Sequence, residues 1–158
     1  MANGAQFTVA ASLAAGAASV STTLNDIRAA IEGRIATEMA LSPAYPVSYQ
    51  NAPYVQPNNS TWLGVQFRFG DSAYLTLLGP STGFNQQNGT VIVNIYTPLN
   101  SGAGANFTVA ERIKNLFSRV KLTSIIFDAP SGPAQVLPAQ PGSFFQTRII
   151  TTFTANLD

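Results

Sequence analysis

The chain has 158 residues, with no cysteine and no histidine, and charged side chains make up only 9% of it, for a formal net charge of +1. These numbers exclude disulfides, thiolate nucleophiles, cysteine-based zinc sites and imidazole catalysis, and the eight scattered cations form no basic stripe for tight nucleic-acid binding. The length suits one domain with its own core, and the lack of a continuous apolar run of about 18 residues argues against a membrane span.

Residues 1–22 are rich in Ala, Gly, Ser and Thr, with few large apolar groups, among them Phe7, Val9 and Leu13. We interpret this segment as an extended arm or a short weak helix, held either by a neighbouring subunit or by its own domain. Its apolar part imitates the core of a signal peptide, but no Lys or Arg precedes Arg28, so we do not expect secretion. The remaining residues, 23–158, form one predicted domain.

An amphipathic helix is predicted over residues 23–41. Thr23 and Asp26 make a capping-box start, and Pro43 enforces the end. The buried stripe recurs at three- and four-residue steps and comprises Leu24, Ile27, Ile31, Ile35 and Met39. Two ion pairs are expected on the water-facing side, Arg28–Glu32 and Arg34–Glu38.

The stretch 44–69 holds a short strand, a loop punctuated by prolines and a strand that alternates from Trp62 onward. A turn at Asp71 and Ser72 and a second apolar run, residues 73–78, suggest an antiparallel partner for that strand. A polar loop then follows over residues 79–89 and contains Phe84. The next run, residues 90–96, is β-branched and apolar, which indicates a central strand covered on both faces.

The second half begins with a Gly/Ala hinge at residues 101–105 and a helix predicted from Thr108, which forms a capping box with Glu111. A short strand at 124–127, an extended proline-rich loop at 128–142 and a long strand at 143–157 complete the chain. The predicted fold class is therefore α+β: a mostly antiparallel sheet with two amphipathic helices packed on one face, plus an extended N-terminal arm.

The chemistry-bearing residues are few and scattered. Asp71 and Asp128 are the one acidic pair that folding could bring together, and we expect no catalytic, cofactor or metal site and no enzyme. The cations of the second helix suit a solvated face or, alternatively, a patch for an acidic partner or a DNA backbone: Arg112, Lys114, Arg119 and Lys121. A surface so short of ions is expected to meet other subunits, with a compositionally biased or secreted monomer as the alternative.

An aromatic-Gln-Asn triplet, Tyr49, Gln50 and Asn51, stands before the proline-rich loop and its apolar strand. The central strand ends in Ile95, Tyr96 and Pro98, and a Gly/Ala loop leads into the helix segment ERIKNLF. With Pro53, Tyr54, Pro57, Trp62 and Leu63 in the expected places, the layout of residues 23–158 resembles the tail terminator proteins of long-tailed bacteriophages.

The resemblance implies a structural virion protein of the phage neck. It would form a homo-oligomeric ring, usually a hexamer, that caps the tail tube, stops its polymerisation and joins the tail to the head connector, while DNA passes through the lumen without specific binding. Assembly in the host cytoplasm and no membrane contact would follow. The residues expected at interfaces come from the arm and from the two long loops: Phe7, Val9, Leu13, Phe84, Gln86, Gln87, Val136 and Leu137.

Two alternatives remain open from the sequence. A different neck or tail-tube component would share the size and the sheet-plus-helix construction. A small secreted domain that binds carbohydrate or another surface would also be poor in charge, and Trp62, Tyr54 and Phe84 would then form an exposed platform. An enzyme ranks third.

Overall fold

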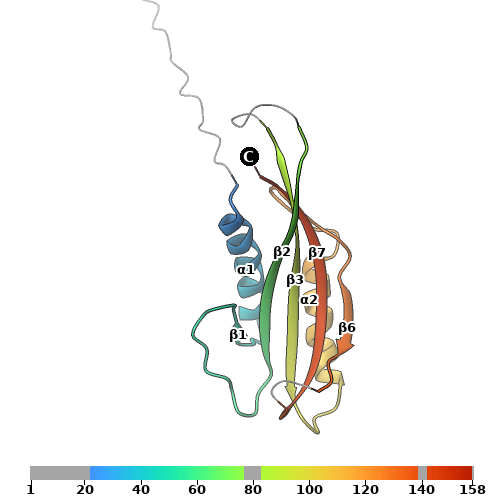
Figure 1. The fold of residues 1–158 in the computed structure, drawn as a ribbon. Coiled ribbons are helices and arrows are strands. Elements are labelled where there is room, and N and C mark those ends of the chain that lie inside the picture. Colours follow the sequence, from blue (N-terminus) through green and yellow to red (C-terminus); the bar gives the residue numbers. More distant parts are fainter. Residues whose placement is uncertain (1–21, 77–82, 139–141, 158) are drawn as a thin grey trace, which may run out of the picture.

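Two helices cover one face of a long, twisted sheet in the computed structural model, which describes residues 22–76, 83–138 and 142–157 (Figure 1). The elements, in chain order, are α1 (Leu24–Ala40), β1 (Val47–Ser48), β2 (Trp62–Tyr74), β3 (Asn85–Pro98), α2 (Gly104–Phe117), β4 (Lys121–Leu122), β5 (Ile125–Phe127), β6 (Ser131–Gln135) and β7 (Phe144–Leu157). This arrangement confirms the predicted α+β fold with both helices on one face.

The sheet has seven strands in the order β1-β2-β3-β7-β5-β4, and β6 also pairs with β7. Among the strands that the structure describes, the β1–β2 pair alone is parallel. β5 and β6 follow one another along the side of β7 that faces away from β3, because β5 pairs with residues 153–155 and β6 with residues 147–150. Three strands of 13 or 14 residues, β2, β3 and β7, therefore form the centre of the sheet.

Helix α1 forms where the spacing of apolar residues predicted it. Thr23 caps the helix reciprocally with Asp26, and the predicted stripe is buried from Ile27 to Met39. The prediction is wrong for Leu24, which is 44% exposed because the first turn of the helix lies beyond the core. Arg28 pairs with Glu32 as expected.

The second predicted ion pair of α1, Arg34–Glu38, is wrong. Both side chains reach across to α2 instead: Arg34 donates to the carbonyl of Leu116 at 3.0 Å, and Glu38 accepts from Arg112 at 3.2 Å. Arg112 also donates to the backbone carbonyls of Glu38 at 2.7 Å and Pro43 at 2.8 Å. These charges fasten the two helices together, because hydrogen bonds to neighbouring elements satisfy more of the guanidinium than one pair along a helix.

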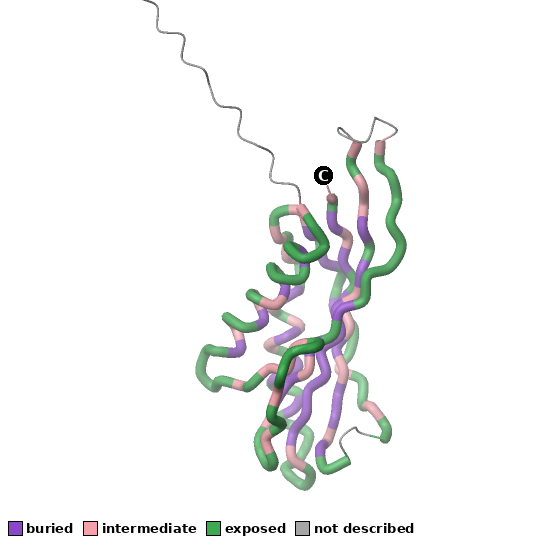
Figure 2. The backbone as a smooth tube through the Cα atoms, turned by 60° about the vertical axis from the view of Figure 1, so that its left-hand side comes forward, coloured by how far each residue is buried: buried purple, intermediate pink, exposed green. Residues whose placement is uncertain are grey.

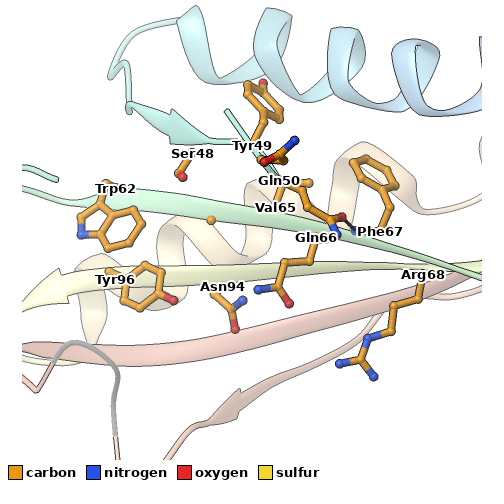
Figure 3. Close-up of a pocket in the computed structure, with 12 residues that line it drawn as sticks. Ser48, Tyr49, Gln50, Trp62, Val65, Gln66, Phe67, Arg68, Asn94 and Tyr96 are labelled. Carbon is orange, nitrogen blue, oxygen red and sulfur yellow. Dashed lines mark hydrogen bonds between the residues drawn. The ribbon is translucent and has the colours of Figure 1, made fainter. Parts of the chain in front are cut away.

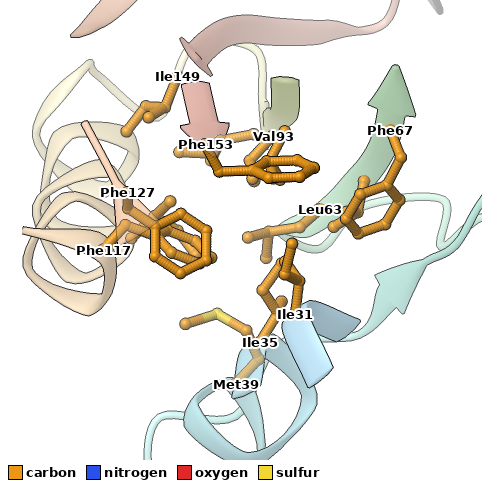
Figure 4. Packing of buried hydrophobic residues seen from close by; sticks show 14 of the residues in the cluster. Ile31, Ile35, Met39, Leu63, Phe67, Val93, Phe117, Phe127, Ile149 and Phe153 are labelled. Atoms are coloured by element: carbon orange, nitrogen blue, oxygen red, sulfur yellow. The ribbon is translucent and has the colours of Figure 1, made fainter. Parts of the chain in front are cut away.

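The core lies between the helices and the sheet (Figure 4). Phe117 of α2 packs on Phe127 of β5 with ring centroids 4.9 Å apart, and Phe127 in turn packs near Phe153 of β7. Gly89 of β3 lies under the Phe153 ring so closely that a Cβ there would be 2.3 Å from its Cζ atom. Alternate residues of β2, β3 and β7 complete the core, which matches the two-residue period of the sequence.

Strand β2 differs from the prediction. The expected turn at Asp71 and Ser72 is a bulge within one continuous strand, since the register with β3 shifts between Phe69 and Ser72. The run 73–78 therefore does not pair with residues 62–69, and its first two residues, Ala73 and Tyr74, continue β2. β3 begins at Asn85, five residues before the predicted start. Its polar first residues form strand because they pair with β2 on one side and with β7 on the other.

Helix α2 begins at Gly104 and not at Thr108, so the predicted capping box is wrong. The hydroxyl of Thr108 donates to the carbonyl of Gly104 at 3.0 Å, inside the helix. The first turn has no side-chain cap and is held by the buried Asn106, whose amide donates to the Ile95 carbonyl at 3.2 Å. Tertiary hydrogen bonds thus replace the missing cap.

The proline-rich segment 128–142 contains strand β6, which the sequence did not predict. The strand pairs with the edge of β7, and the hydroxyl of Ser131 donates to the carbonyl of Ile150 at 3.1 Å. The short strand β4 was also missed. Gly132 makes the pairing possible, because its φ is +101° and a Cβ would lie 2.5 Å from the carbonyl oxygen of Arg148.

Candidate functional site

The described residues of the two loops predicted to make contacts lie at opposite ends of the long sheet (Figure 1). The end of β2 and the start of β3 are at one end, and residues 136–138, which follow β6, are at the other. With about 3.3 Å per residue, strands of this length span about 45 Å. The molecule therefore offers two contact regions that one small partner cannot cover together.

One end carries a cluster of exposed apolar side chains, which we call the tip surface: Phe69, Tyr74, Leu75 and Phe84. Tyr74 is 83% exposed and Phe84 is 50% exposed. The backbone beneath them is ordered, since the amide of Leu75 donates to the Phe84 carbonyl at 2.9 Å and the amide of Phe84 donates to the Thr76 hydroxyl at 3.0 Å. The strands continue beyond the helices here, which leaves this hairpin exposed along its outer side (Figure 2).

The two predicted glutamines of this region have different surroundings. Gln86 is half-buried in β3, whereas Gln87 is buried with 5% exposure. The Gln87 amide donates to the carbonyl of Gly70 at 2.8 Å, and its oxygen accepts from the Ser72 hydroxyl at 2.5 Å. Gln87 therefore satisfies hydrogen-bonding groups of the β2 bulge and is not free to contact a partner. Of the three residues predicted as contacts in this region, Phe84 is the exposed one.

The opposite end carries a second group of exposed apolar residues, which we call the base surface: Val55, Leu99 and Leu137. Leu137 is 76% exposed and Val55 is 91% exposed. The neighbouring Val136 is half-buried, and its amide donates to the Gln146 carbonyl at 3.0 Å. The exposed Leu137 therefore directly follows a residue whose backbone is hydrogen-bonded to β7.

The predicted arm residues Phe7, Val9 and Leu13 lie outside the described residues. The division of the chain into an arm and one domain stays a prediction for the same reason.

The helix-free face of the sheet carries an aromatic cluster (Figure 3). Trp62 stacks on Tyr96 with centroids 3.9 Å apart, Phe144 meets Trp62 edge-on at 6.1 Å, and Tyr54 packs at 5.4 Å. Trp62 is only 7% exposed, and Phe84 is at the other end of the hairpin. The platform expected for a carbohydrate-binding domain is therefore not formed.

A groove of about 510 Å³ runs from this cluster along β2. Its walls are the turn after β1, from Ser48 to Asn51, and the β2 residues up to Arg68 (Figure 3). On its floor, Asn94 accepts from Gln146 at 3.1 Å and from Arg148 at 3.0 Å. The polar part of its lining consists of amides, hydroxyls and the guanidinium of Arg68, and no Asp or Glu is among the described residues that line it.

Three tyrosines in or beside the groove have a raised pKa. Burial raises the pKa of Tyr96, and the nearby Arg148 opposes that shift in part. Burial raises the pKa of Tyr49 and of Tyr54 as well, and Glu32 adds to the shift at Tyr49. These phenols stay protonated at neutral pH and act as hydrogen-bonding and packing groups.

The acidic pair considered from the sequence is not brought together. Asp71 lies on β2 and Asp128 follows β5, so β3 and β7 separate them by three strand spacings, about 14 Å. Asp128 accepts instead from the Thr152 hydroxyl. Within the described part of the chain, no group of three or more Asp or Glu residues is arranged to hold a metal ion.

The cations of α2 are partly structural. Arg112 binds α1, as described above, and Lys114 donates to the carbonyl of Gly132 at 2.9 Å, which ties α2 to β6. These contacts favour a solvated, internally bonded helix face over a patch for DNA. No helix among the described residues is long and apolar enough to cross a membrane.

One comparison with known proteins identifies a family, and another supports the fold alone. No curated protein matches the chain significantly. A solved structure whose name states no function is similar in fold, with a TM-score of 0.60, 19% identity, and coverage of 87% of this chain and 96% of the other. The family described as phage tail terminator protein matches residues 26–125, which is 100 of the 158 residues and includes α1, the aromatic-Gln-Asn triplet, the central hairpin and α2. The chain belongs to the phage tail terminator protein family.

Proposed function

We propose that this protein forms a ring at the neck of a phage, caps the tail tube, stops its polymerisation and joins the tail to the head connector. Membership in the tail terminator family makes it a structural protein of the phage tail. We propose six subunits for this ring. Assembly is supported by the low charge of the chain, because surfaces that become interface cores are depleted in ions.

One observation carries the proposal: exposed apolar side chains, grouped above as the tip surface and the base surface, lie at opposite ends of a sheet about 45 Å long. A protein that joins two assemblies needs two separate contact regions. One would face the last ring of the tail tube and the other the connector. Large exposed apolar side chains such as Phe84 and Leu137 are the type that partners bury at interfaces.

We infer further that the protein works by shape complementarity and not by catalysis. The groove beside β2 has no acid–base pair, and its tyrosines are held in the protonated form. DNA would pass the lumen without specific contacts. Assembly would take place in the host cytoplasm before the protein becomes part of the virion.

The proposal is tested by purifying the full chain and measuring its mass and its shape by negative-stain microscopy, alone and with the tail tube protein of the same phage. We expect closed single rings alone and, with the tube protein, tubes that stop growing with a ring at one end. Long tubes formed by this chain alone would instead identify a tube component. A monomer at high concentration would overturn the ring.

The two surfaces are tested by Phe84→Ser and Leu137→Ser, with Ile126→Ser as a matched control, because Ile126 is 51% exposed on β5, three strands across the sheet from β2. Each of the first two variants should weaken one axial contact and keep the other, measured as tube capping and connector binding. The control should keep both. Equal loss in all three variants would contradict the assignment of the two ends.

A further inference from the structure

The outer edge of β2, the side away from β3, is largely unpaired. β1 pairs only with Leu63 and Gly64, and β2 continues for ten more residues to Tyr74. Among the described residues, no other strand pairs with this side of β2. An unpaired edge of this length is a template for another strand.

Two hydrogen bonds define the direction of the backbone at this edge. Leu63 donates outward to the Pro46 carbonyl at 3.0 Å, and Phe67 donates outward to the side-chain oxygen of Gln50 at 3.2 Å. The backbone N–H groups of every second residue in a strand point to the same side. The N–H group of Phe69 therefore also points outward, away from β3. Beyond the bulge, the amide of Leu75 donates inward to the Phe84 carbonyl at 2.9 Å. The backbone N–H and C=O groups of its neighbour Tyr74 therefore point outward.

The side chains of this edge also lack cover. Gln50 occupies the edge only as far as Phe67, and beyond it Phe69 and Tyr74 are 38% and 83% exposed. A strand added between Phe69 and Tyr74 would bury both rings and satisfy the outward-facing backbone groups at the same time.

We propose that residues 7–13 of a second copy of this chain add as a strand to the outer edge of β2 between Phe69 and Tyr74. This inference rests on the proposed ring and names its donor and acceptor surfaces. The segment FTVAASL alternates large or apolar residues at Phe7, Val9 and Leu13 with small ones, which is the period of a strand with one apolar face.

The length and composition of the N-terminal segment fit this role. The segment has no proline and no charged side chain before Asp26, so nothing in it blocks strand pairing or repels the neutral edge. Residues 14–22 can span up to about 30 Å when extended. Helix α1, to which they lead, begins at the end of the sheet where the β2–β3 hairpin turns (Figure 1).

A second copy is favoured because donor and acceptor are different surfaces of one chain. Such a head-to-tail contact repeats from subunit to subunit and closes a ring when the rotation is right. Tyr74 and the outer edge remain exposed within the single chain.

The test uses engineered disulfides in the full chain, which has no cysteine of its own. Protein with Ala73→Cys is mixed with protein carrying Thr8→Cys, Ala10→Cys or Ser12→Cys, because the sequence does not fix the register. We expect one or two of the three mixtures to give a species with the mass of two 16.7-kDa chains on non-reducing gels, since a disulfide needs Cα atoms about 4.4–6.8 Å apart.

The matched control replaces the acceptor by Val55→Cys, which is 91% exposed at the opposite end. Cross-linking to this control as strong as to Ala73→Cys would overturn the inference. So would a double variant, Ala10→Cys with Ala73→Cys, that closes within one chain while the mixtures give no cross-link.

A proline variant separates this inference from the proposed function. Val9→Pro should raise the dissociation constant of the ring at least about tenfold, because proline removes a ladder hydrogen bond, while Ala17→Pro should leave it unchanged. Rings that form equally well with both variants would overturn strand addition and leave the ring standing. A native chain that never forms rings would instead overturn the proposed function.

Discussion

The two halves of the β2–β3 hairpin have the same alternating pattern but different surroundings. Near the start of β2, Leu63 and Val65 lie under the helices and are at most 2% exposed. Beyond the bulge, Tyr74 is 83% exposed although it belongs to the same strand. Figure 2 shows this change along the hairpin.

The comparison shows that coverage by the helix layer, and not the pattern of the strand, decides which apolar residues are buried. Burying one aromatic or aliphatic side chain contributes about 1.5–3 kcal/mol. In the covered half this contribution stabilises the fold. In the tip half it remains available for a partner.

The largest expected loss of stability comes from truncating a buried side chain in the half of the hairpin that the helices cover. Leu63→Ala should lower the free energy of unfolding by about 2–5 kcal/mol, because the side chain is completely buried and leaves a cavity. Tyr74→Ala should change it by less than about 0.5 kcal/mol. Chemical denaturation of both variants at one protein concentration measures the difference, and equal losses would contradict the comparison.

A smaller effect is expected where the two halves meet. Gly89→Ala should cost about 1–3 kcal/mol, because the new methyl group would enter the Phe153 ring, 2.3 Å from Cζ. Gly70→Ala is the matched control on the neighbouring strand, since its Cβ would meet only the Asn88 carbonyl at 3.7 Å. Thermal denaturation should show a clear loss for the first variant and little change for the second; a stable Gly89→Ala protein would mean that Phe153 can move freely.

The smallest expected effect concerns pH and lies at the start of α1. Hydrogen bonds from the Thr23 hydroxyl and amide lower the pKa of Asp26 below its usual value of 3.8. Because the folded pKa is lowered, the contribution of the ionised cap is present above pH 3.8 and is lost as the pH falls through the folded value.

This pH effect is measured with Asp26→Asn. The difference in unfolding free energy between the native protein and the variant should shrink as the pH is lowered below 3.8. A difference that stays constant across this range would show that the carboxylate charge does not contribute to the cap.

The sequence predicted the elements that depend on local spacing. The α1 stripe at Ile27, Ile31 and Ile35 and the alternation in β2, β3 and β7 appear as expected, because residues at these steps share a face in any helix or strand. The fold class followed from their order along the chain.

The errors occur where tertiary pairing outweighs local preference. The polar residues 85–88 read as a loop but are strand because β2 and β7 pair with them on both sides. Strand β6 forms in a proline-rich segment because the edge of β7 is open to it. Asn106 could have been found from the sequence, since it lies three residues before Val109 on the buried stripe of α2.

The candidate contact regions were only partly predictable. Loop length indicated the ends that carry Phe84 and Leu137, but the burial of Gln87 depends on the bulge in β2. The unpaired edge of β2 could not be predicted. It exists because β1 is short and pairs with only two residues of β2, Leu63 and Gly64.

The three central strands also have a mechanical consequence. β2, β3 and β7 run side by side along the whole distance between the tip surface and the base surface. A pull between those ends acts along the strands, perpendicular to their hydrogen bonds, so that the bonds share the force and resist shear together. Each subunit is therefore expected to resist extension along its long axis more strongly than separation of its strands.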